Sequence, residues 1–363
     1  MTNASDFIFD RSKSTVAAVQ QGQFTWSAPS NIALVKYWGK KENQIPANPS
    51  LSFTLSNCKT ITTLAFTSKA AKGISFDLSF DGKPKEEFKP KVQKFFERIV
   101  NYCPYIEEYH FAIDTTNTFP HSSGIASSAS GMAALSMNIM SLERLLHPTM
   151  AEAYFLNKAS FLARLGSGSA CRSIKGEVVI WGEQADVLGS SDLFGIEAPF
   201  AIHPNFKEYQ DVILLVDKGE KQVSSTVGHD LMHNHPFAAE RFKQAHQNLG
   251  MLKNILETGD LTKFVALVES EALTLHAMMM TSMPYFILMK PNTLQIIEKI
   301  WAFRAKTAIP VCFTLDAGAN VHLLFPAAVK NEVLHFVQES LSDFCQNKQF
   351  IEDKVGGGAL FIK

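Results

Sequence analysis

The chain has 363 residues, a length that predicts two domains, and its 46% hydrophobic and 19% charged residues are typical of a globular protein. The formal net charge of −1 argues against nucleic acid or an anionic membrane as the main partner. Any basic site must therefore be local.

The sequence contains five cysteines, an odd number, widely spaced and without a CxxC pair. They suggest neither a disulfide framework nor a zinc site, and a reducing compartment fits them best. No run of about 18 apolar residues occurs, and the first residues lack the basic and apolar regions of a signal peptide. We therefore expect a soluble cytoplasmic protein with no membrane and no nucleic-acid partner.

Residues 1–25 are polar and weakly patterned, which predicts an N-terminal extension. Residues 27–41 then begin as a strand and end in a cluster of aromatic residues and lysines. One interpretation is ordinary amphipathic packing. The functional alternative is a polar group at a strand end whose donors face an anionic ligand. Its members are Asn31, Lys36, Tyr37 and Lys40.

Short strands follow, and the last of them leads into a loop rich in small and hydroxyl residues. The Asp81-Gly82 pair predicts a hairpin turn, and the mixed charges of residues 83–91 predict a solvated linker into a helix. The expected strands are residues 50–55, 60–67, 73–78 and 109–115, and the expected helix is residues 92–100.

The loop at residues 120–131 is the first candidate phosphate site. Good helix formers follow it up to the break at His147-Pro148, so the loop is expected to deliver backbone N–H groups to a helix N-terminus, which favours an oxyanion. Gly124 permits close backbone approach. The alternative is a turn with a capping serine, and the pattern is neither a P-loop nor a Rossmann motif. The hydroxyls that could add donors or meet Mg²⁺ belong to Ser122, Ser123, Ser127, Ser128 and Ser130.

A second Gly/Ser loop, residues 166–173, follows a predicted helix at residues 150–165. Ser167, Ser169 and Arg172 supply hydroxyls and a bidentate cation there, a combination suited to phosphate or carboxylate. The alternative is a flexible turn before the strand at residues 177–181.

The loop-rich, Gly- and Pro-containing segment at residues 183–206 predicts a domain boundary, with one domain at residues 26–205 and another at 206–363. Residues 223–226 form a hydroxyl cluster that includes Ser225, whereas His233 and His235 lack a nearby third metal ligand and receive no role. The second half alternates strands and helices, as in an α+β protein. Its expected strands are residues 211–216, 309–315, 321–325 and 359–362, and its expected helices are residues 236–257, 261–279, 293–306 and 326–344.

Asp316 lies at the tip of an apolar strand and is followed by Ala-Gly-Ala. It is either a turn cap or a carboxylate placed against a substrate hydroxyl.

Five segments in order resemble the GHMP kinase superfamily and, within it, the mevalonate diphosphate decarboxylases. The resemblance implies a two-domain α+β fold, each domain a mainly antiparallel sheet with helices packed on it, and an active site in the cleft between the domains. The segments are NIALVKYWGK at residues 31–40, the ATP loop at residues 120–131, GSGSACRS at residues 166–173, VSST at residues 223–226 and FTLDAG at residues 313–318.

By its motifs, the resemblance implies an ATP- and Mg²⁺-dependent decarboxylation of mevalonate 5-diphosphate to isopentenyl diphosphate through 3-O-phosphorylation. Asp316, Lys36 and Arg172 would be catalytic, and Arg172 would also hold the substrate carboxylate. The other implied substrate-binding residues are Asn31, Tyr37, Lys40, Ser167, Ser169 and Ser225. The implied ATP-binding residues are Ser122, Ser123, Gly124, Ala126, Ser127 and Ser128, the last two also meeting Mg²⁺. A homodimer is implied as well.

The sequence departs from this family in two places. The ATP loop reads His121-Ser122-Ser123 where Thr-Ala-Ala is frequent, and the stretch at residues 269–277 keeps His276-Ala277 without the usual Asp-Ser-Asn. Open alternatives are a decarboxylase of mevalonate 5-phosphate, a mevalonate kinase that does not decarboxylate, and a ligand sensor that has lost turnover.

Overall fold

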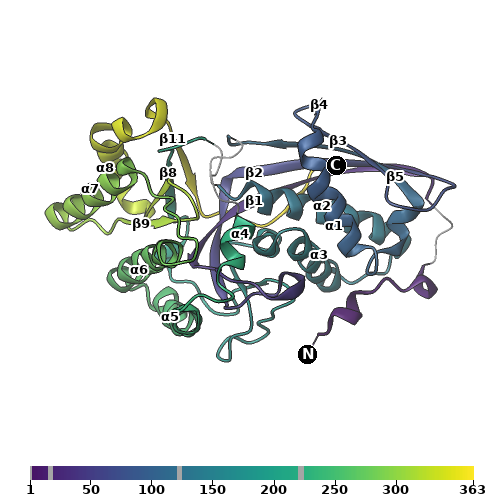
Figure 1. Ribbon diagram of the computed structural model, residues 1–363, viewed down its shortest axis with the longest axis horizontal. Coiled ribbons are helices and arrows are strands. Elements are labelled where there is room, and N and C mark those ends of the chain that lie inside the picture. The colour runs from purple at the N-terminus through teal and green to yellow at the C-terminus, as the bar shows by residue number, and fades with distance from the viewer. Residues whose placement is uncertain (1, 15–18, 121–124, 220–224) are drawn as a thin grey trace.

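Two sheets organise the chain in the computed structural model, which describes residues 2–14, 19–120, 125–219 and 225–363. Within these residues, one sheet has eight strands and the other has four, and each carries helices (Figure 1). All strand pairs are antiparallel except β3 with β5, so the expected α+β fold with mainly antiparallel sheets is confirmed.

The first sheet is built on two long strands and runs in the order β12-β1-β2-β5-β3-β4, with β6 and β7 extending from β2. Three helices cover it: α2 contacts β1 and β2, and α3 packs against α1 and α2 (Figure 1). The strands are β1 (Gln21–Val35), β2 (Ser50–Ser68), β3 (Phe76–Phe80), β4 (Lys83–Pro84), β5 (Tyr109–Asn117), β6 (Val178–Trp181), β7 (Ile196–Glu197) and β12 (Leu360–Phe361). The helices are α1 (Lys89–Ile99), α2 (Ser127–Leu146) and α3 (Glu152–Gly166).

Strand β2 replaces the two separate strands expected at residues 50–55 and 60–67. Its pairing with β1 jumps from Pro29↔Lys59 to Asn31↔Thr54, so residues 55–58 form a bulge rather than a turn. The carboxylate of Asp353 accepts hydrogen bonds from the backbone N–H groups of residues 56, 57 and 58, at 2.9, 2.8 and 2.7 Å. This distant partner satisfies the amides that the bulge removes from the ladder.

The N-terminal residues pack on the first domain. Phe7 is buried, and its ring lies 4.7 Å from that of Phe161 and 5.9 Å from that of Phe194. Strand β1 then begins at Gln21, inside the extension expected at residues 1–25. The apolar side chain of Phe7 thus places part of that segment in the core.

The second sheet has the order β11-β8-β10-β9. One core lies between this sheet and α7 and α8, and another joins its opposite face to α5, α6 and the strands β1 and β2. The two halves of the chain therefore share buried apolar contacts. The elements are β8 (Gln210–Leu214), β9 (Cys312–Leu315), β10 (Val321–Phe325), β11 (Phe350–Lys354), α4 (Ser225–Asp230), α5 (Ala238–Thr258), α6 (Leu261–Met280), α7 (Pro291–Thr307) and α8 (Lys330–Phe336).

The end of the chain returns to the first sheet. Strand β12 pairs with β1 in the register Trp26↔Phe361 and Ser27↔Leu360. The last residues of the segment expected as the second domain, 206–363, thus complete the first sheet. No helix within the described residues is long and apolar enough to cross a membrane.

Candidate active site

An ion pair joins the two halves of the molecule at the centre of the candidate site. Lys36, just after β1, places its Nζ 3.0 Å from Oδ1 of Asp316, just after β9. The Lys36 side chain is 1% exposed and that of Asp316 is 28% exposed, so the carboxylate remains accessible to a ligand. Burial lowers the pKa of Lys36, and the charge of Asp316 opposes this shift.

The backbone of Lys36 is held by residues that sequence reasoning missed. Its N–H donates to Oε2 of Glu271 at 2.8 Å, and its carbonyl accepts from Asn48 and Arg241 at 2.9 and 3.2 Å. Glu271 and Arg241 form a fully buried ion pair of 2.6 Å. The only signal in the sequence was an acidic residue in an apolar helix, at the stretch that departs from the family pattern.

The turn that carries Asp316 is fixed by a second helix residue. His276 of α6 donates from Nε2 to the backbone oxygen of Asp316 at 3.2 Å. Burial lowers the pKa of His276 to about 4, so the imidazole is neutral at neutral pH. A neutral ring can donate this bond without adding charge beside the carboxylate.

Arg172 lies in a short 3-10 helix, Gly168–Ser173, at the segment where the sequence left a flexible turn as the alternative. The guanidinium donates to Oδ1 of Asn31 at 3.3 Å and to Oγ of Ser50 at 2.5 Å. Asn31 in turn donates to Oγ of Ser173 and to the backbone oxygen of Ser169, at 2.8 and 3.2 Å. The structure therefore brings Asn31, Ser169 and Arg172 together.

Tyr37 and Lys40 lie beside this group. The Tyr37 ring is 4.6 Å from the ring of Trp181, and a side chain at Gly168 would place its Cβ 2.8 Å from Oη of Tyr37. A larger residue at position 168 would therefore displace the side chain of Tyr37 or Trp181. Lys40 forms an ion pair of 3.5 Å with Asp230 of α4.

The two Gly/Ser loops meet at their serines. Helix α2 begins at Ser127, preceded by Ala126 in the left-handed region at φ +47°. Oγ of Ser128 lies 3.2 Å from Oγ of Ser167 in the second loop. Of the remaining predicted ATP-binding residues, Ser122, Ser123 and Gly124 lie outside the described residues, as does the side chain of Ser225.

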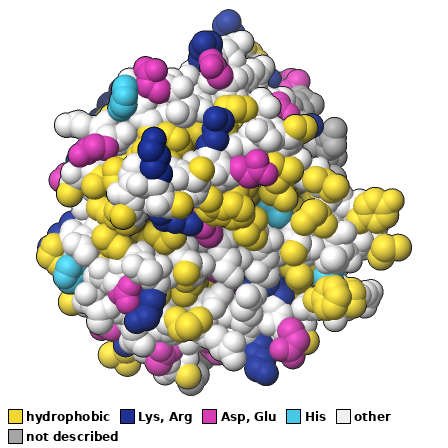
Figure 2. Space-filling model, turned by 90° about the vertical axis from the view of Figure 1, so that its left-hand side faces the viewer, with side chains coloured by type: hydrophobic (Ala, Val, Ile, Leu, Met, Phe, Trp, Pro, Cys, Tyr) yellow, Lys and Arg dark blue, Asp and Glu magenta, His cyan; other side chains and the backbone are white. Residues whose placement is uncertain are grey.

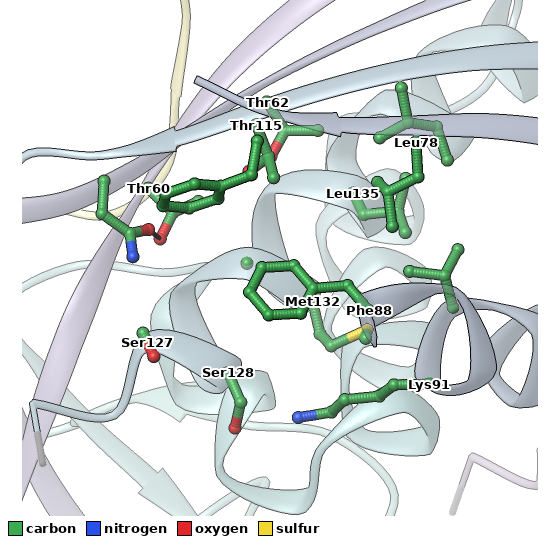
Figure 3. A pocket seen from close by; sticks show the side chains of 15 residues that line it. Thr60, Thr62, Leu78, Phe88, Lys91, Thr115, Ser127, Ser128, Met132 and Leu135 are labelled. Atoms are coloured by element: carbon green, nitrogen blue, oxygen red, sulfur yellow. Dashed lines mark hydrogen bonds between the residues drawn. The ribbon is translucent and has the colours of Figure 1, made fainter. Parts of the chain in front are cut away.

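A pocket with a cavity volume of about 130 Å³ opens beside the start of α2 (Figure 3). Its walls are mostly apolar, and Ser127 and Ser128 lie at one side of it. Lys91 of α1 points toward Ser128 in Figure 3, and desolvation lowers the pKa of Lys91 to about 8. Lys91 lines this pocket and is also exposed to solvent, in agreement with the solvated character predicted for residues 83–91. The apolar lining residues are Leu78, Phe80, Phe88, Val92, Ile113, Met132 and Leu135.

Comparisons with known proteins match both halves of the chain. The family model for the diphosphomevalonate decarboxylase-like N-terminal domain matches residues 28–193, and that for the mevalonate 5-diphosphate decarboxylase C-terminal domain matches residues 211–357. Diphosphomevalonate decarboxylase ERG19 of Gibberella zeae is 31% identical, over 81% of this chain and 78% of its own length. Diphosphomevalonate decarboxylase of Saccharomyces cerevisiae is 30% identical, over 86% of this chain and 80% of its own length.

Solved structures agree with these matches. A structure described as MDDEF in complex with MVAPP, AMPPCP and magnesium superposes with a TM-score of 0.80 at 27% identity, covering 94% of this chain and 99% of its own. Mevalonate diphosphate decarboxylase from Staphylococcus aureus gives a TM-score of 0.80 at 26% identity, covering 94% of this chain and 98% of its own. The chain belongs to the diphosphomevalonate decarboxylase family.

Proposed function

We propose that this protein catalyses the ATP-dependent decarboxylation of mevalonate 5-diphosphate to isopentenyl diphosphate, ADP, phosphate and CO₂, a step of isoprenoid biosynthesis in the mevalonate pathway. The observation that carries the proposal is the Lys36–Asp316 ion pair between the two halves of the chain. The charge of Arg172 contributes to lowering the pKa of Lys36, and the charge of Asp316 acts to raise the pKa of Arg172, so the three groups lie close together. One anion and two cations thus converge where an alcohol, a phosphoryl group and a carboxylate must meet.

The chemistry explains why these groups are needed. Hydroxide is a poor leaving group, so the tertiary 3-hydroxyl must first attack the γ-phosphorus of ATP and release ADP. The C3–O bond of the resulting phosphate ester then breaks, and phosphate departs with the bonding electrons. Positive charge develops at C3, and the bond between the carboxylate and C2 supplies its electrons to form the C2–C3 double bond and CO₂.

Each central residue has a role that its surroundings support. Asp316 accepts or orients the proton of the 3-hydroxyl, since its carboxylate stays accessible while Lys36 and His276 fix its position. Lys36 stabilises the negative charge on the transferring phosphoryl group. Arg172 holds the substrate carboxylate, with Asn31 fixing the orientation of the guanidinium.

The diphosphate of the substrate is assigned to the group around the second loop. Tyr37, Lys40, Ser167 and Ser169 supply the donors, and Ser225 contacts the substrate from the start of α4. Lys40 is available for this role because its partner Asp230 is 3.5 Å away and half exposed.

The residues beside α2 fit ATP. The apolar pocket walls suit a nucleobase, and the N-terminus of α2 suits phosphate oxygens, with Ser127 and Ser128 between them (Figure 3). ATP supplies the phosphoryl group, and Mg²⁺ supplies charge neutralisation. No group of three or more His, Cys, Asp or Glu side chains among the described residues could hold a metal ion. We therefore assign Mg²⁺ to the hydroxyls of Ser127 and Ser128 together with phosphate oxygens, as suits this cation. The loop residues Ser122, Ser123, Gly124 and Ala126 complete the proposed ATP site.

The decisive experiment measures CO₂ release and ADP formation from mevalonate, its 5-phosphate and its 5-diphosphate with Mg·ATP. CO₂ from the diphosphate alone supports the proposal, and CO₂ only from the monophosphate would reassign the substrate. ADP without CO₂ from all three would identify a kinase and overturn the proposal. ATP binding without any turnover would identify a sensor.

We also propose that the protein is a cytoplasmic homodimer with a domain boundary near residue 205. The described cysteines are all free thiols, which supports a reducing compartment.

Large apolar side chains are exposed after α6, and Figure 2 shows hydrophobic side chains gathered on the side of the molecule formed by the second half. Light scattering should give twice the chain mass of 40.2 kDa; a monomer would refute the dimer. The exposed residues are Met283, Tyr285 and Ile287, at 80, 71 and 61%.

A further inference from the structure

His229 lies in the wall of the substrate site without a role in the proposed reaction. It belongs to α4 and is 9% exposed. Its ring lies 4.2 Å from the ring of Tyr37 and 4.7 Å from that of Trp38. The imidazole is therefore fixed between two aromatic rings, one of which belongs to the residue assigned to the substrate diphosphate.

A hydrogen bond defines the tautomer of this imidazole. The backbone N–H of Gly39 donates to Nδ1 of His229 at 2.9 Å, so Nδ1 carries a lone pair and the proton of the neutral ring lies on Nε2. Among the residues that the structure describes, no hydrogen-bond acceptor for Nε2 is found. Among the described residues, Nε2 of His229 is also not one of the fully buried side-chain atoms that lack a partner, so its N–H is accessible to an acceptor from a ligand.

The charged groups around His229 keep the ring neutral and attract an anion. Lys40 and Arg172 face it from the end of β1 and from the 3-10 helix, and Asp230 follows it in α4 and pairs with Lys40. Tyr37 adds a phenol. Burial, with the two cations as further causes, lowers the pKa of His229 to about 3. The ring therefore supplies an N–H donor without a third positive charge.

We propose that His229 is a substrate-binding residue that donates its Nε2–H to a phosphate oxygen of the substrate, in the subsite of Tyr37 and Lys40. This inference rests on the proposed function, which places the diphosphate in that subsite. The anion meets one cation, Lys40, and neutral donors from Tyr37 and His229. These three donors can bind a phosphate group through directional hydrogen bonds, and only one of them is a charged group that must lose its water.

Two substitutions separate the proposed donor from the rest of the ring. H229N can accept the Gly39 N–H through its amide oxygen but has no donor at the place of Nε2, whereas the longer side chain of H229Q can place an N–H there. The matched control is H235N, because His235 is equally buried and bonds the backbone of Met278 away from the site. Steady-state kinetics and calorimetric titration with mevalonate 5-diphosphate are measured for all variants.

H229N should raise KM and Kd for mevalonate 5-diphosphate by about 10-fold, the effect of one hydrogen bond to a charged group, with kcat and KM for ATP within about 2-fold. H229Q should restore most of the affinity, and H235N should leave these constants unchanged. Equal weakening in H229N and H229Q, or no weakening in either, would overturn the inference. An equal rise in KM for ATP would also overturn it, since that would indicate general loosening.

The pH dependence of substrate binding tests the charge state of the His229 ring. Because the imidazole stays neutral between about pH 6 and pH 8, the ratio of the Kd values of H229N and wild type should not change with pH over that range. Diverging profiles would show that the ring titrates and would overturn the neutral donor. If wild type released no CO₂ but H229N still bound mevalonate 5-diphosphate about 10-fold more weakly, the proposed function would fail and the inference would stand.

Discussion

Among the described residues, two buried lysines pair with carboxylates, and their surroundings differ. Lys158 of α3 lies 2.7 Å from Oε2 of Glu143 of α2, and the two side chains are 0 and 1% exposed. Glu143 also accepts from the hydroxyl of Tyr105 at 3.0 Å. Lys36 is buried to the same degree, but its partner Asp316 is 28% exposed.

This difference in exposure distinguishes the structural pair, Lys158–Glu143, from the pair in the candidate active site, Lys36–Asp316. In the core pair, burial acts against the charge, but the neighbouring Cys103 and Glu143 raise the pKa of Lys158 above its ordinary value. In the site, burial dominates and the pKa of Lys36 is lowered. The core pair is closed by protein groups on all sides, whereas the site pair leaves one side of its carboxylate for a ligand.

The largest effect is expected from a substitution that breaks the Lys36–Asp316 pair, whose carboxylate is accessible to a ligand. D316N keeps the size of the side chain but removes the base and the charge that faces Lys36, so kcat should fall by roughly 10²- to 10⁴-fold. ATP affinity, measured by calorimetry, should change little because Asp316 is not among the residues that line the pocket assigned to the nucleobase. Retention of near-wild-type CO₂ release would remove Asp316 from the mechanism.

Breaking the buried Lys158–Glu143 pair should lower the stability of the fold rather than the activity. K158M leaves Glu143 buried without its cation, which should cost about 3–5 kcal/mol of unfolding free energy. Denaturant unfolding measures this loss, and the double variant K158M/E143L should regain part of it. kcat at a temperature where the variant is folded should remain within about 2-fold of wild type. A large loss of kcat in the folded variant would contradict the division between the two pairs.

The pH dependence of kcat/KM tests the charge of Lys36, with a smaller expected effect than D316N. The protonated form of Lys36 is lost as pH rises through its lowered pKa, so kcat/KM should fall on the alkaline side below 10.5, the ordinary lysine value. Lys91, whose pKa is lowered to about 8, could produce a similar decline through ATP binding. The profile of K91M should keep the Lys36 decline. A flat profile in K91M would contradict the role of the Lys36 charge.

The smallest expected effect concerns the contact between the two Gly/Ser loops. S167A removes the partner of Ser128 and one donor to the substrate, so KM for mevalonate 5-diphosphate should rise by about 3- to 10-fold, the effect of one hydrogen bond. S136A serves as the control, because Ser136 is buried in the same helix as Ser128 but away from the loops. Equal KM values for the two variants would refute a contribution from Ser167.

Local patterns in the sequence predicted most strands and helices and the segments that carry Lys36 and Asp316. They could not predict contacts that depend on distant partners. Glu271 holds the backbone of Lys36 across 235 positions, and Asp353 satisfies the bulge in β2 across about 300. Neither residue lies in a motif, because its effect depends on where another strand or helix ends. The position of Lys91 beside the pocket could not be predicted for a different reason: an exposed charge run looks the same in the sequence whether or not it borders a pocket.

The pairing of β12 with β1 has a consequence for synthesis of the protein on the ribosome. Trp26 finds its strand partner Phe361 only when the end of the chain has emerged, and the backbone N–H of Thr25 donates to the carbonyl of Lys363 at 2.7 Å. Until then one edge of β1 lacks its neighbour while the rest of the first sheet has all its strands. Contacts so distant in sequence form late, because closing a long loop is entropically costly. The first sheet therefore draws its strands from both halves of the described chain and is complete only when residues 360–361 pair with β1.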